Sequence, residues 1–312
     1  MKNKFIKIFF IFVLNLSFLQ ISHSKEFSFN APEIEVSDNG DIYKSLQRGK
    51  ITTSDQIEIN SNNFEYLKKN NTLKATGNVQ LIDSKNDIVI NTEQIFYLKN
   101  EDKIYTSGKT TVIISNKYIL NGYDLILLRN KMILSSDKEA IINDKLSNIY
   151  KFSKFQYLIN EEILKGSKIE VTTNNDKANS DKLFFDNGFF NLKEKKFLAK
   201  NINIEFHKTL FDNNKNDPRI SALSGVGDEF NTYFKKGVFT TCEKKKKCPP
   251  WKIKSKEIHH DKVKKQIIYK DAWLEIYDFP FIYFPKFFHP DPSVKRQSGF
   301  LKPELGSSQN LG

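Results

Sequence analysis

The amino-acid sequence predicts an all-β protein built from stacked pairs of strands. Between residue 51 and about residue 206, apolar and polar residues alternate in short runs separated by turn residues, which is typical of half-buried strands. One unit recurs 31 residues on, from Ile59 to Ile90 and from Gly77 to Gly108. No apolar stripe of helical length accompanies the repeat, so we expect a β-jelly roll of stacked strand pairs. An ordinary antiparallel sandwich with accidental periodicity is the alternative.

The composition indicates a folded chain, and it does not decide which class of acidic ligand the chain binds. The 312 residues include 27 phenylalanines, and disordered chains are poor in aromatic residues. The net charge is +12, and only four of the 49 basic residues are arginine, which suggests a compositional bias toward lysine. A basic protein can bind nucleic acid, anionic lipid or phosphorylated glycolipid, and charge alone does not choose between them.

The N-terminus predicts export from the cytoplasm. Lys2 and Lys4 precede a mostly apolar run over residues 6–19, and Ser22 and Ser24 offer small residues before a cleavage site. We therefore expect residues 1–24 to be a secretory signal peptide. An uncleaved anchor is the alternative. Export excludes nucleic acid as a partner.

The remaining elements follow in order along the chain. Residues 25–50 form an N-terminal extension, and residues 51–278 contain the strand-rich domain. A polar loop is expected over residues 211–222, and clean alternation returns over 272–277. Further strands are expected at residues 57–66, 73–81, 88–97, 104–112, 118–128, 132–142, 163–171, 183–190, 202–206, 237–241, 251–258 and 265–269.

The segment after residue 278 is rich in phenylalanine. It is too short for a membrane-spanning helix, which needs roughly 20 apolar residues, and it fits one tilted barrel strand of about 9–11 residues. Pro280 and Pro285 also oppose a helix. A basic, proline-rich turn follows over residues 290–298, and Gly299-Phe300-Leu301 reads as the start of a second strand.

This segment resembles the LptD (OstA, Imp) family of outer-membrane lipopolysaccharide assembly proteins, at the junction between periplasmic domain and barrel. The matching residues are Tyr283-Phe284-Pro285, then the run from His289-Pro290-Asp291-Pro292 to Arg296, and Ser298-Gly299-Phe300-Leu301. A weaker resemblance to OstA-like domains extends back to about Ile51. Family members continue into a large barrel, so residues 279–312 are expected to be a truncated barrel start.

The resemblance implies lipopolysaccharide transport at the outer membrane without covalent chemistry or a cofactor. The lipid would lie in an apolar groove of the jelly roll and pass to the barrel, where each buried methylene gains about 0.8 kcal/mol. Lysines at the rim would meet its phosphates. Candidate groove residues, which could equally be plain core, are Ile57, Ile59, Val79, Leu81, Ile88, Ile90, Val112, Leu120 and Leu134.

The resemblance also implies partners and a lateral gate. An LptA-like periplasmic bridge protein would add its strand to the edge of the jelly roll, and an LptE-like lipoprotein would plug the barrel. The location would be the cell outer membrane, with the N-terminal domain in the periplasm. Pro285 and Pro303 are gate candidates, since proline cannot donate to a strand ladder, although turn roles explain them equally well.

Cys242 and Cys248 predict a local disulfide in an oxidising compartment, which would stabilise the fold by roughly 2 kcal/mol. The resemblance offers a link to the barrel instead. Zinc would need more nearby ligands than this loop supplies, so no metal is expected. The nearest catalytic grouping, His289, Asp291 and Ser293, reads as a turn.

Two rival functions remain. One is a stand-alone periplasmic lipopolysaccharide carrier, which would not need residues 279–312. The other is a secreted β-solenoid enzyme that modifies glycans, which would need a pair of carboxylates on one face.

Overall fold

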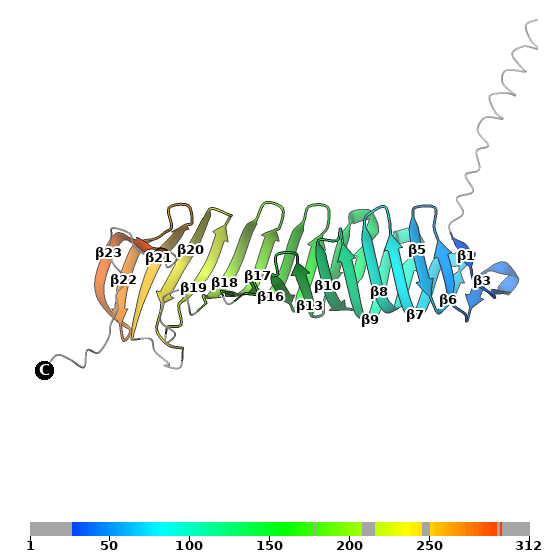
Figure 1. The fold of residues 1–312 in the computed structure, drawn as a ribbon, viewed down its shortest axis with the longest axis horizontal. Coiled ribbons are helices and arrows are strands. Elements are labelled where there is room, and N and C mark those ends of the chain that lie inside the picture. The colour runs from blue at the N-terminus through cyan, green and yellow to red at the C-terminus, as the bar shows by residue number, and fades with distance from the viewer. Residues whose placement is uncertain (1–26, 178, 208–215, 245–249, 292–293, 295–312) are drawn as a thin grey trace, which may run out of the picture.

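The structure is a computed structural model that describes residues 27–177, 179–207, 216–244, 250–291 and 294. These residues form one continuous antiparallel sheet of 23 strands, drawn out along a single axis (Figure 1). The all-β prediction is therefore confirmed. The described part of the chain contains no helix long and apolar enough to cross a membrane.

The strands fall into two kinds, short and long. The short strands are β1 (Ser28–Asn30), β2 (Glu35–Ser37), β3 (Ile42–Ser45), β4 (Gly49–Thr52), β5 (Ile57–Ser61), β6 (Asn63–Leu67), β10 (Tyr118–Tyr123), β11 (Ile126–Leu128), β12 (Ile133–Ser136), β13 (Ala140–Asp144), β14 (Ile149–Phe152) and β15 (Lys154–Leu158). The long strands are β7 (Thr72–Asp83), β8 (Ile88–Leu98), β9 (Lys103–Ile114), β16 (Ile163–Thr172), β17 (Lys182–Asn191), β18 (Lys196–Glu205), β19 (Arg219–Gly227), β20 (Asn231–Thr240), β21 (Trp251–Asp261), β22 (Gln266–Ile276) and β23 (Phe279–Pro290).

Each rung of the stack is one long strand or two short strands end to end, and each rung bends in its middle. Residues at the bend have left-handed backbone, including Asn78 (φ 47°), Lys168 (φ 46°) and Asn201 (φ 51°). These residues have no directly paired residue on the neighbouring strand, whereas the residues on either side of the bend are paired. The bends align from rung to rung, so they divide the sheet into two wings. Wing A contains β1, β4, β5, β10, β13, β14 and the matching halves of the long strands, and wing B contains β2, β3, β6, β11, β12, β15 and the other halves.

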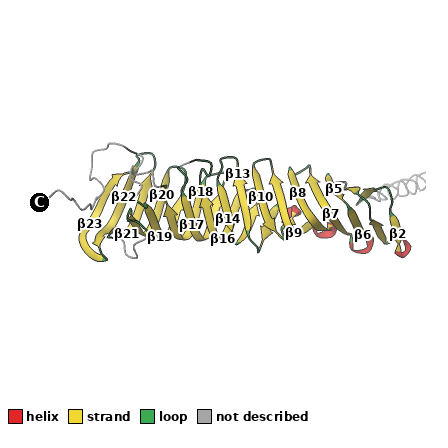
Figure 2. Cartoon of the chain, turned by 60° about the horizontal axis from the view of Figure 1, so that its bottom comes forward, coloured by secondary structure: helices red, strands yellow, loops and turns green. Residues whose placement is uncertain are grey.

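The 31-residue repeat corresponds to two successive rungs. Short 3-10 turns close wing B at η2 (Lys68–Asn70), η3 (Lys99–Glu101) and η4 (Arg129–Lys131), and a similar turn, η1 (Asp38–Gly40), precedes them. They lie along one edge of the stack (Figure 2). Backbone N–H groups link successive turns, since Lys99 donates to the Asn71 carbonyl at 3.1 Å and Arg129 to the Asp102 carbonyl at 2.9 Å. The repeat is thus a structural period rather than an accident of composition.

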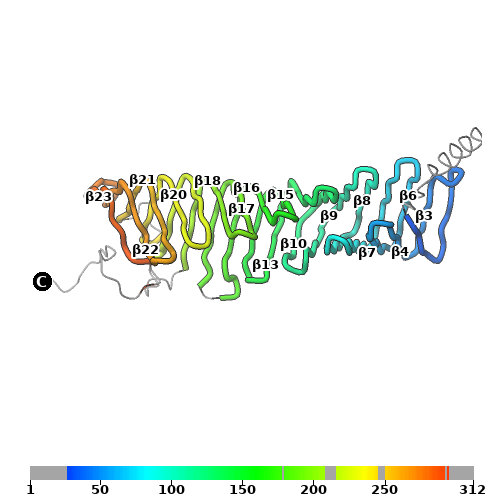
Figure 3. The backbone as a smooth tube through the Cα atoms, turned by 90° about the horizontal axis from the view of Figure 1, so that it is seen from above, coloured from blue at the N-terminus to red at the C-terminus, as the bar shows by residue number. Residues whose placement is uncertain are grey.

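Figure 3 shows the rungs following one another from the N-terminal to the C-terminal end of the stack. The apolar core lies between the wings, with members from Ile51 to Ala272. Rings from opposite wings meet there. The ring centroids of Tyr118 and Tyr157 are 6.0 Å apart, and those of Phe185 and Phe190 are 5.7 Å apart. Alternation places every second residue inward, which explains why such a polar chain has a continuous core.

The segment Phe279–Pro290, which was expected to begin a barrel, forms the last described rung of the stack. Phe279–Pro290 pairs with β22 along its length, so the stack continues past residue 278. Pro285 stands at the bend opposite Asp271, where the register drops out, and a position without ladder pairing tolerates proline. Assignment of this segment to a barrel stays a prediction, and Pro303 lies outside the described residues, as does the signal peptide. The polar loop was predicted to extend to residue 222, but residues 219–222 belong to strand β19 (Arg219–Gly227).

Candidate functional site

All nine candidate groove residues point into the space between the wings. Each is at most 2% exposed, and all belong to one core cluster. Eight lie on wing A, and Leu134 lies on wing B. In the described conformation they pack against the opposite wing, so contact with a lipid requires the wings to separate. Their role as a groove stays a prediction.

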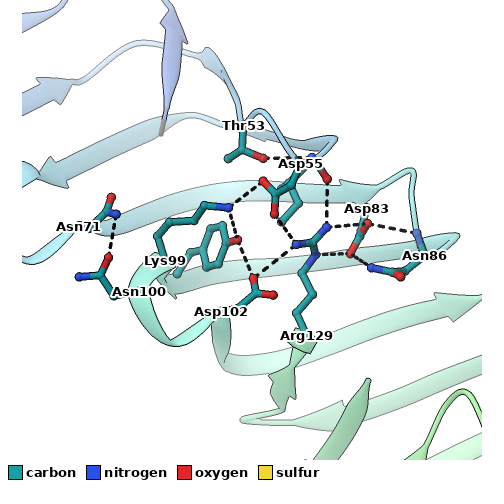
Figure 4. A network of polar contacts seen from close by, with 11 residues as sticks. Thr53, Asp55, Asn71, Asp83, Asn86, Lys99, Asn100, Asp102 and Arg129 are labelled. Carbon is teal, nitrogen blue, oxygen red and sulfur yellow. Dashed lines mark hydrogen bonds and ion pairs between the residues drawn. The ribbon is translucent and has the colours of Figure 1, made fainter. Parts of the chain in front are cut away.

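A cluster of charges crosses from wing A to wing B near the N-terminal end (Figure 4). The Arg129 guanidinium, at the end of wing B, pairs with Asp83 on wing A at 2.6 Å and also with Asp55. Lys99 binds Asp55 at 2.7 Å, and Asp102 lies 3.4 Å from Arg129. The side chains of Arg129 and Asp83 are 6% and 0% exposed. We call these five residues the arginine clasp.

Hydrogen bonds and neighbouring charges favour the charged forms of Asp55 and Arg129. Partial burial alone would raise the pKa of Asp55, but hydrogen bonds from Lys99 and Thr53 and the charge of Arg129 outweigh it and hold that pKa well below its usual value. Burial opposes the charge on Arg129, yet hydrogen bonding and attraction to Asp83 raise its pKa above the ordinary value. Asp55 and Arg129 therefore stay ionised at neutral pH.

A second polar link crosses the same opening further along the stack. Lys117 Nζ lies 3.1 Å from Glu162 Oε1, and the Tyr118 hydroxyl donates to Glu162 Oε2 at 3.2 Å. Burial and the neighbouring carboxylate raise the pKa of Tyr118 to about 12. We call these three residues the glutamate clasp. The direct links Asp55 to Lys99, Asp83 to Arg129 and Lys117 to Glu162 span 44, 46 and 45 residues, so successive repeats place a link at matching positions.

Next to the glutamate clasp, the ends of the two wings leave a hollow. Wing A contributes residues 117–118 and 144–150, and wing B contributes residues 190–197. Its floor is aromatic, from Tyr118, Tyr150, Phe190 and Phe197, and its rim carries Lys117, Lys145, Lys195 and Lys196. We call it the lysine-rimmed hollow. Lys117, Lys195 and Lys196 pair with Glu162, Glu229 and Glu194. Apolar rings beside these lysines suit a ligand that joins hydrocarbon to a phosphate, which would take the place of those carboxylates.

Sequence reasoning missed both the clasps and the hollow. Their residues come from turns that meet only after the strands are in register. Lysine is so frequent in this chain that Lys195 and Lys196 carry no special signal in the sequence. The one available signal was Arg129, a rare arginine in a chain that otherwise uses lysine.

The other predicted sites are resolved in part. Cys242 is a half-buried free thiol whose Sγ lies 3.5 Å from the Trp251 carbonyl, so the structure does not support the disulfide. Its expected partner Cys248 lies outside the described residues. The described residues contain no group of three metal ligands.

His289 was expected in a turn but lies near the end of β23, and its described surroundings show no catalytic arrangement. The His289 ring is buried, with Nε2 2.9 Å from the Tyr269 hydroxyl. Asp291 instead meets His260 at 2.5 Å. Ser293 lies outside the described residues. Burial lowers the pKa of His289, so its neutral form is favoured.

The fold and site thus define a protein of stacked antiparallel strands with an apolar interior and a basic opening. No protein-family model matches the sequence, and no curated protein matches it. One solved structure similar to part of the chain is LptH, described as the LptA homologous periplasmic component of the conserved lipopolysaccharide transport device from Pseudomonas aeruginosa. It shares 12% identity over 47% of this chain and 85% of that chain, with a TM-score of 0.29. A score this low carries no argument about function, so the proposals below rest on the residues themselves.

Proposed function

We propose that this chain binds lipopolysaccharide between its wings and passes it toward the outer membrane, as the N-terminal part of an LptD-like assembly. One observation supports this most directly: a continuous apolar interior meets the surface at the lysine-rimmed hollow. Acyl chains would enter the interior, and the phosphates of the same molecule would meet the lysines. The sequence resemblance at residues 283–301 supplies the direction of transport.

The ends of the stack suit the proposed partners. The outer edges of β1 and β2 have no strand beside them among the described residues, so an LptA-like bridge protein could extend the sheet there. At the other end, β23 would lead into the barrel, where an LptE-like lipoprotein would sit. Pro285 and Pro303 would then lie close to the lateral gate. Each of these assignments belongs to the proposal.

Photo-crosslinking tests where the lipid lies. A benzophenone amino acid replaces Phe190, on the floor of the hollow, or Phe184, which lies on the outer face of wing A as the paired neighbour of Glu170. Both sites are natural phenylalanines, but Phe190 is buried and Phe184 is half-buried, so far-UV circular dichroism must first show that both variants fold. Irradiation with lipopolysaccharide should label the Phe190 variant and leave the Phe184 variant unlabelled. Equal labelling, or labelling at Phe184 alone, would refute the proposed site.

A stand-alone periplasmic carrier is the second candidate, and one observation favours it. Phe279–Pro290 extends the stack as β23, so this rung has a place in the stack without any barrel. Fractionation of source cells separates the two, using antibody against residues 25–230 on heated and unheated samples. A heat-shifted band in the outer membrane well above 36.4 kDa supports the barrel assembly, and a smaller soluble periplasmic band supports the carrier.

The glycan-modifying enzyme has less support. The carboxylates that the structure gathers most closely, Asp55, Asp83 and Asp102, are all engaged by Arg129. Carboxylates held in ion pairs across a wing opening have a structural explanation. Loss of a measured glycan-modifying activity on substitution of any other carboxylate pair would revive this candidate.

A further inference from the structure

The outer face of wing B carries an exposed apolar row on its seven C-terminal strands. The row crosses the sheet through directly paired residues, one from each strand β17 to β23. Leu198 and Val226 are 56% and 50% exposed, and Phe189, Tyr233 and Phe288 are 37–41% exposed. The outer apolar row consists of Phe189, Leu198, Val226, Tyr233, His259, Ile268 and Phe288.

Core packing does not account for this row. The chain neighbours Phe190, Ala199 and Phe234 point inward and are buried, so alternation directs the row to solvent. Tyr233 and His259 stack on each other at 4.2 Å on this outer surface. The Lys165 ammonium group lies 5.8 Å from the centre of the Phe189 ring, and His259 Nε2 lies 2.8 Å from the Asn231 side-chain oxygen. Leu198 and Val226 are still at least half exposed, so the middle of the row is open apolar surface.

The same row is polar toward the N-terminus. There it contains Glu35, Lys44, Glu65 and Lys74 in direct register. The next aromatic residue, Phe96, is covered by the ammonium group of Lys74 at 5.6 Å from its ring. The row continues through Tyr105 and Ile126, which are half-buried. Along this row, the apolar side chains that are more than a third exposed therefore lie on the C-terminal strands, although both halves share one architecture.

A basic row runs beside the apolar row on the same face. Lys200, Lys235, Lys270 and Lys286 belong to it, all exposed. Its single acid, Glu257, pairs with Lys270 at 2.9 Å. Exposed apolar patches on soluble proteins mark interaction sites, and the lysines give this site a positive charge.

We propose that the outer apolar row and its lysines dock this face on a bilayer surface that contains anionic phospholipid. Seven strands at about 4.8 Å spacing make a strip about 29 Å long, long enough to lie on a membrane rather than to touch it at a point. Aromatic and aliphatic side chains enter the interfacial region while lysines meet the phosphates. A second copy of the chain would bring another net positive row against this one, which disfavours that occupant.

Vesicle flotation tests the proposal with the chain purified after export. Vesicles containing phosphatidylglycerol should carry the protein, vesicles of pure phosphatidylcholine should carry much less, and added salt should release it. Leu198→Thr with Val226→Thr keeps strand propensity and should weaken binding roughly tenfold. Lys200→Gln with Lys235→Gln should weaken it roughly thirtyfold, since each lysine near an anionic surface contributes about a fivefold step.

A matched control uses two exposed lysines elsewhere, Lys109→Gln with Lys168→Gln, which should leave binding unchanged. Circular dichroism confirms that each variant is folded. Equal weakening by the control pair would overturn the proposal, because only total charge would then matter. Absence of vesicle binding by the parent chain would overturn it as well. A concentration-dependent dimer that Leu198→Thr with Val226→Thr abolishes, without vesicle binding, would assign the row to a second copy instead.

Discussion

Replacement of Arg129 by methionine tests whether the arginine clasp joins the two wings. Methionine keeps much of the volume of the side chain and removes its charge. Asp83 would then be a carboxylate with 0% side-chain exposure and no cation beside it. Two hydrogen bonds from Asn86, at 3.2 and 2.7 Å, would remain on that carboxylate. Those bonds offset only part of the lost interaction.

The burial of Asp83 sets the expected loss in the free energy of unfolding of Arg129→Met. Removal of one partner from a buried ion pair costs about 3–5 kcal/mol, because the remaining charge stays buried. Replacement of both partners by apolar residues is often close to neutral. Arg129→Met with Asp83→Leu should therefore recover most of the loss, which makes the pair suitable for a double-mutant cycle.

Urea unfolding followed by far-UV circular dichroism measures the change in the free energy of unfolding of the whole domain. Hydrogen exchange measures the change in the stability of the strands around the arginine clasp. Both tryptophans, Trp251 and Trp273, lie far along the chain and would report the wrong end of the stack. Lys138→Met is the control, since its pair with Asp124 is exposed, at 61% and 38%, and exposed pairs contribute about 0–1 kcal/mol. If Arg129→Met costs no more than Lys138→Met, the clasp does not hold the wings together.

Three further predictions follow from the same structure. Lys195→Gln with Lys196→Gln should raise the dissociation constant for lipopolysaccharide roughly thirtyfold in a titration, while the lysine control pair used for vesicles leaves it unchanged. Burial lowers the pKa of His289 below 6.5, so the unfolded chain binds the extra proton; stability should be full above pH 6.5, fall below it, and lose this dependence in His289→Asn. Gly166→Ala would place its Cβ 2.4 Å from Phe152 and should lower the free energy of unfolding by about 1–3 kcal/mol, whereas an unchanged value would show that the Phe152 ring moves aside.

Local sequence pattern was sufficient to predict many of the strands, but it missed β1 to β3, β14 and β15, which are short. Alternation over Ile57 and Ile59, and again over Ile88 and Ile90, identifies both the strand and its inward face, because the period of two is a property of the strand itself. Turn residues between the runs then fix the length of each rung. The repeat was visible for the same reason, since its turns recur with left-handed residues such as Asn71 and Asp102.

Residue contacts between wings could not be predicted in the same way. Asp83 and Arg129 meet only because the bend in each rung folds wing A over wing B, and no local pattern marks that bend. The bend residues are chemically varied: Asn78, Lys168 and Asp271 all adopt left-handed backbone. The outer apolar row was hidden for a related reason, because its members are spaced unevenly along the chain and become neighbours only through strand register.

The free energy needed to open the clasps can be compared with the free energy that acyl chains gain in the apolar interior. Opening the wings at the arginine clasp costs about 3–5 kcal/mol if its charges lose one another without replacement, and separation of the packed rings adds to that cost. One acyl chain of about twelve methylenes gains about 10 kcal/mol on leaving water. A single chain therefore offsets the clasp and leaves about 5–7 kcal/mol toward the ring packing, and each further chain adds about 10 kcal/mol. Phosphates on the same lipid would also replace the carboxylate partner of Lys117 at the glutamate clasp. A ligand that combines several acyl chains with phosphate is thus the kind that this structure can open to receive.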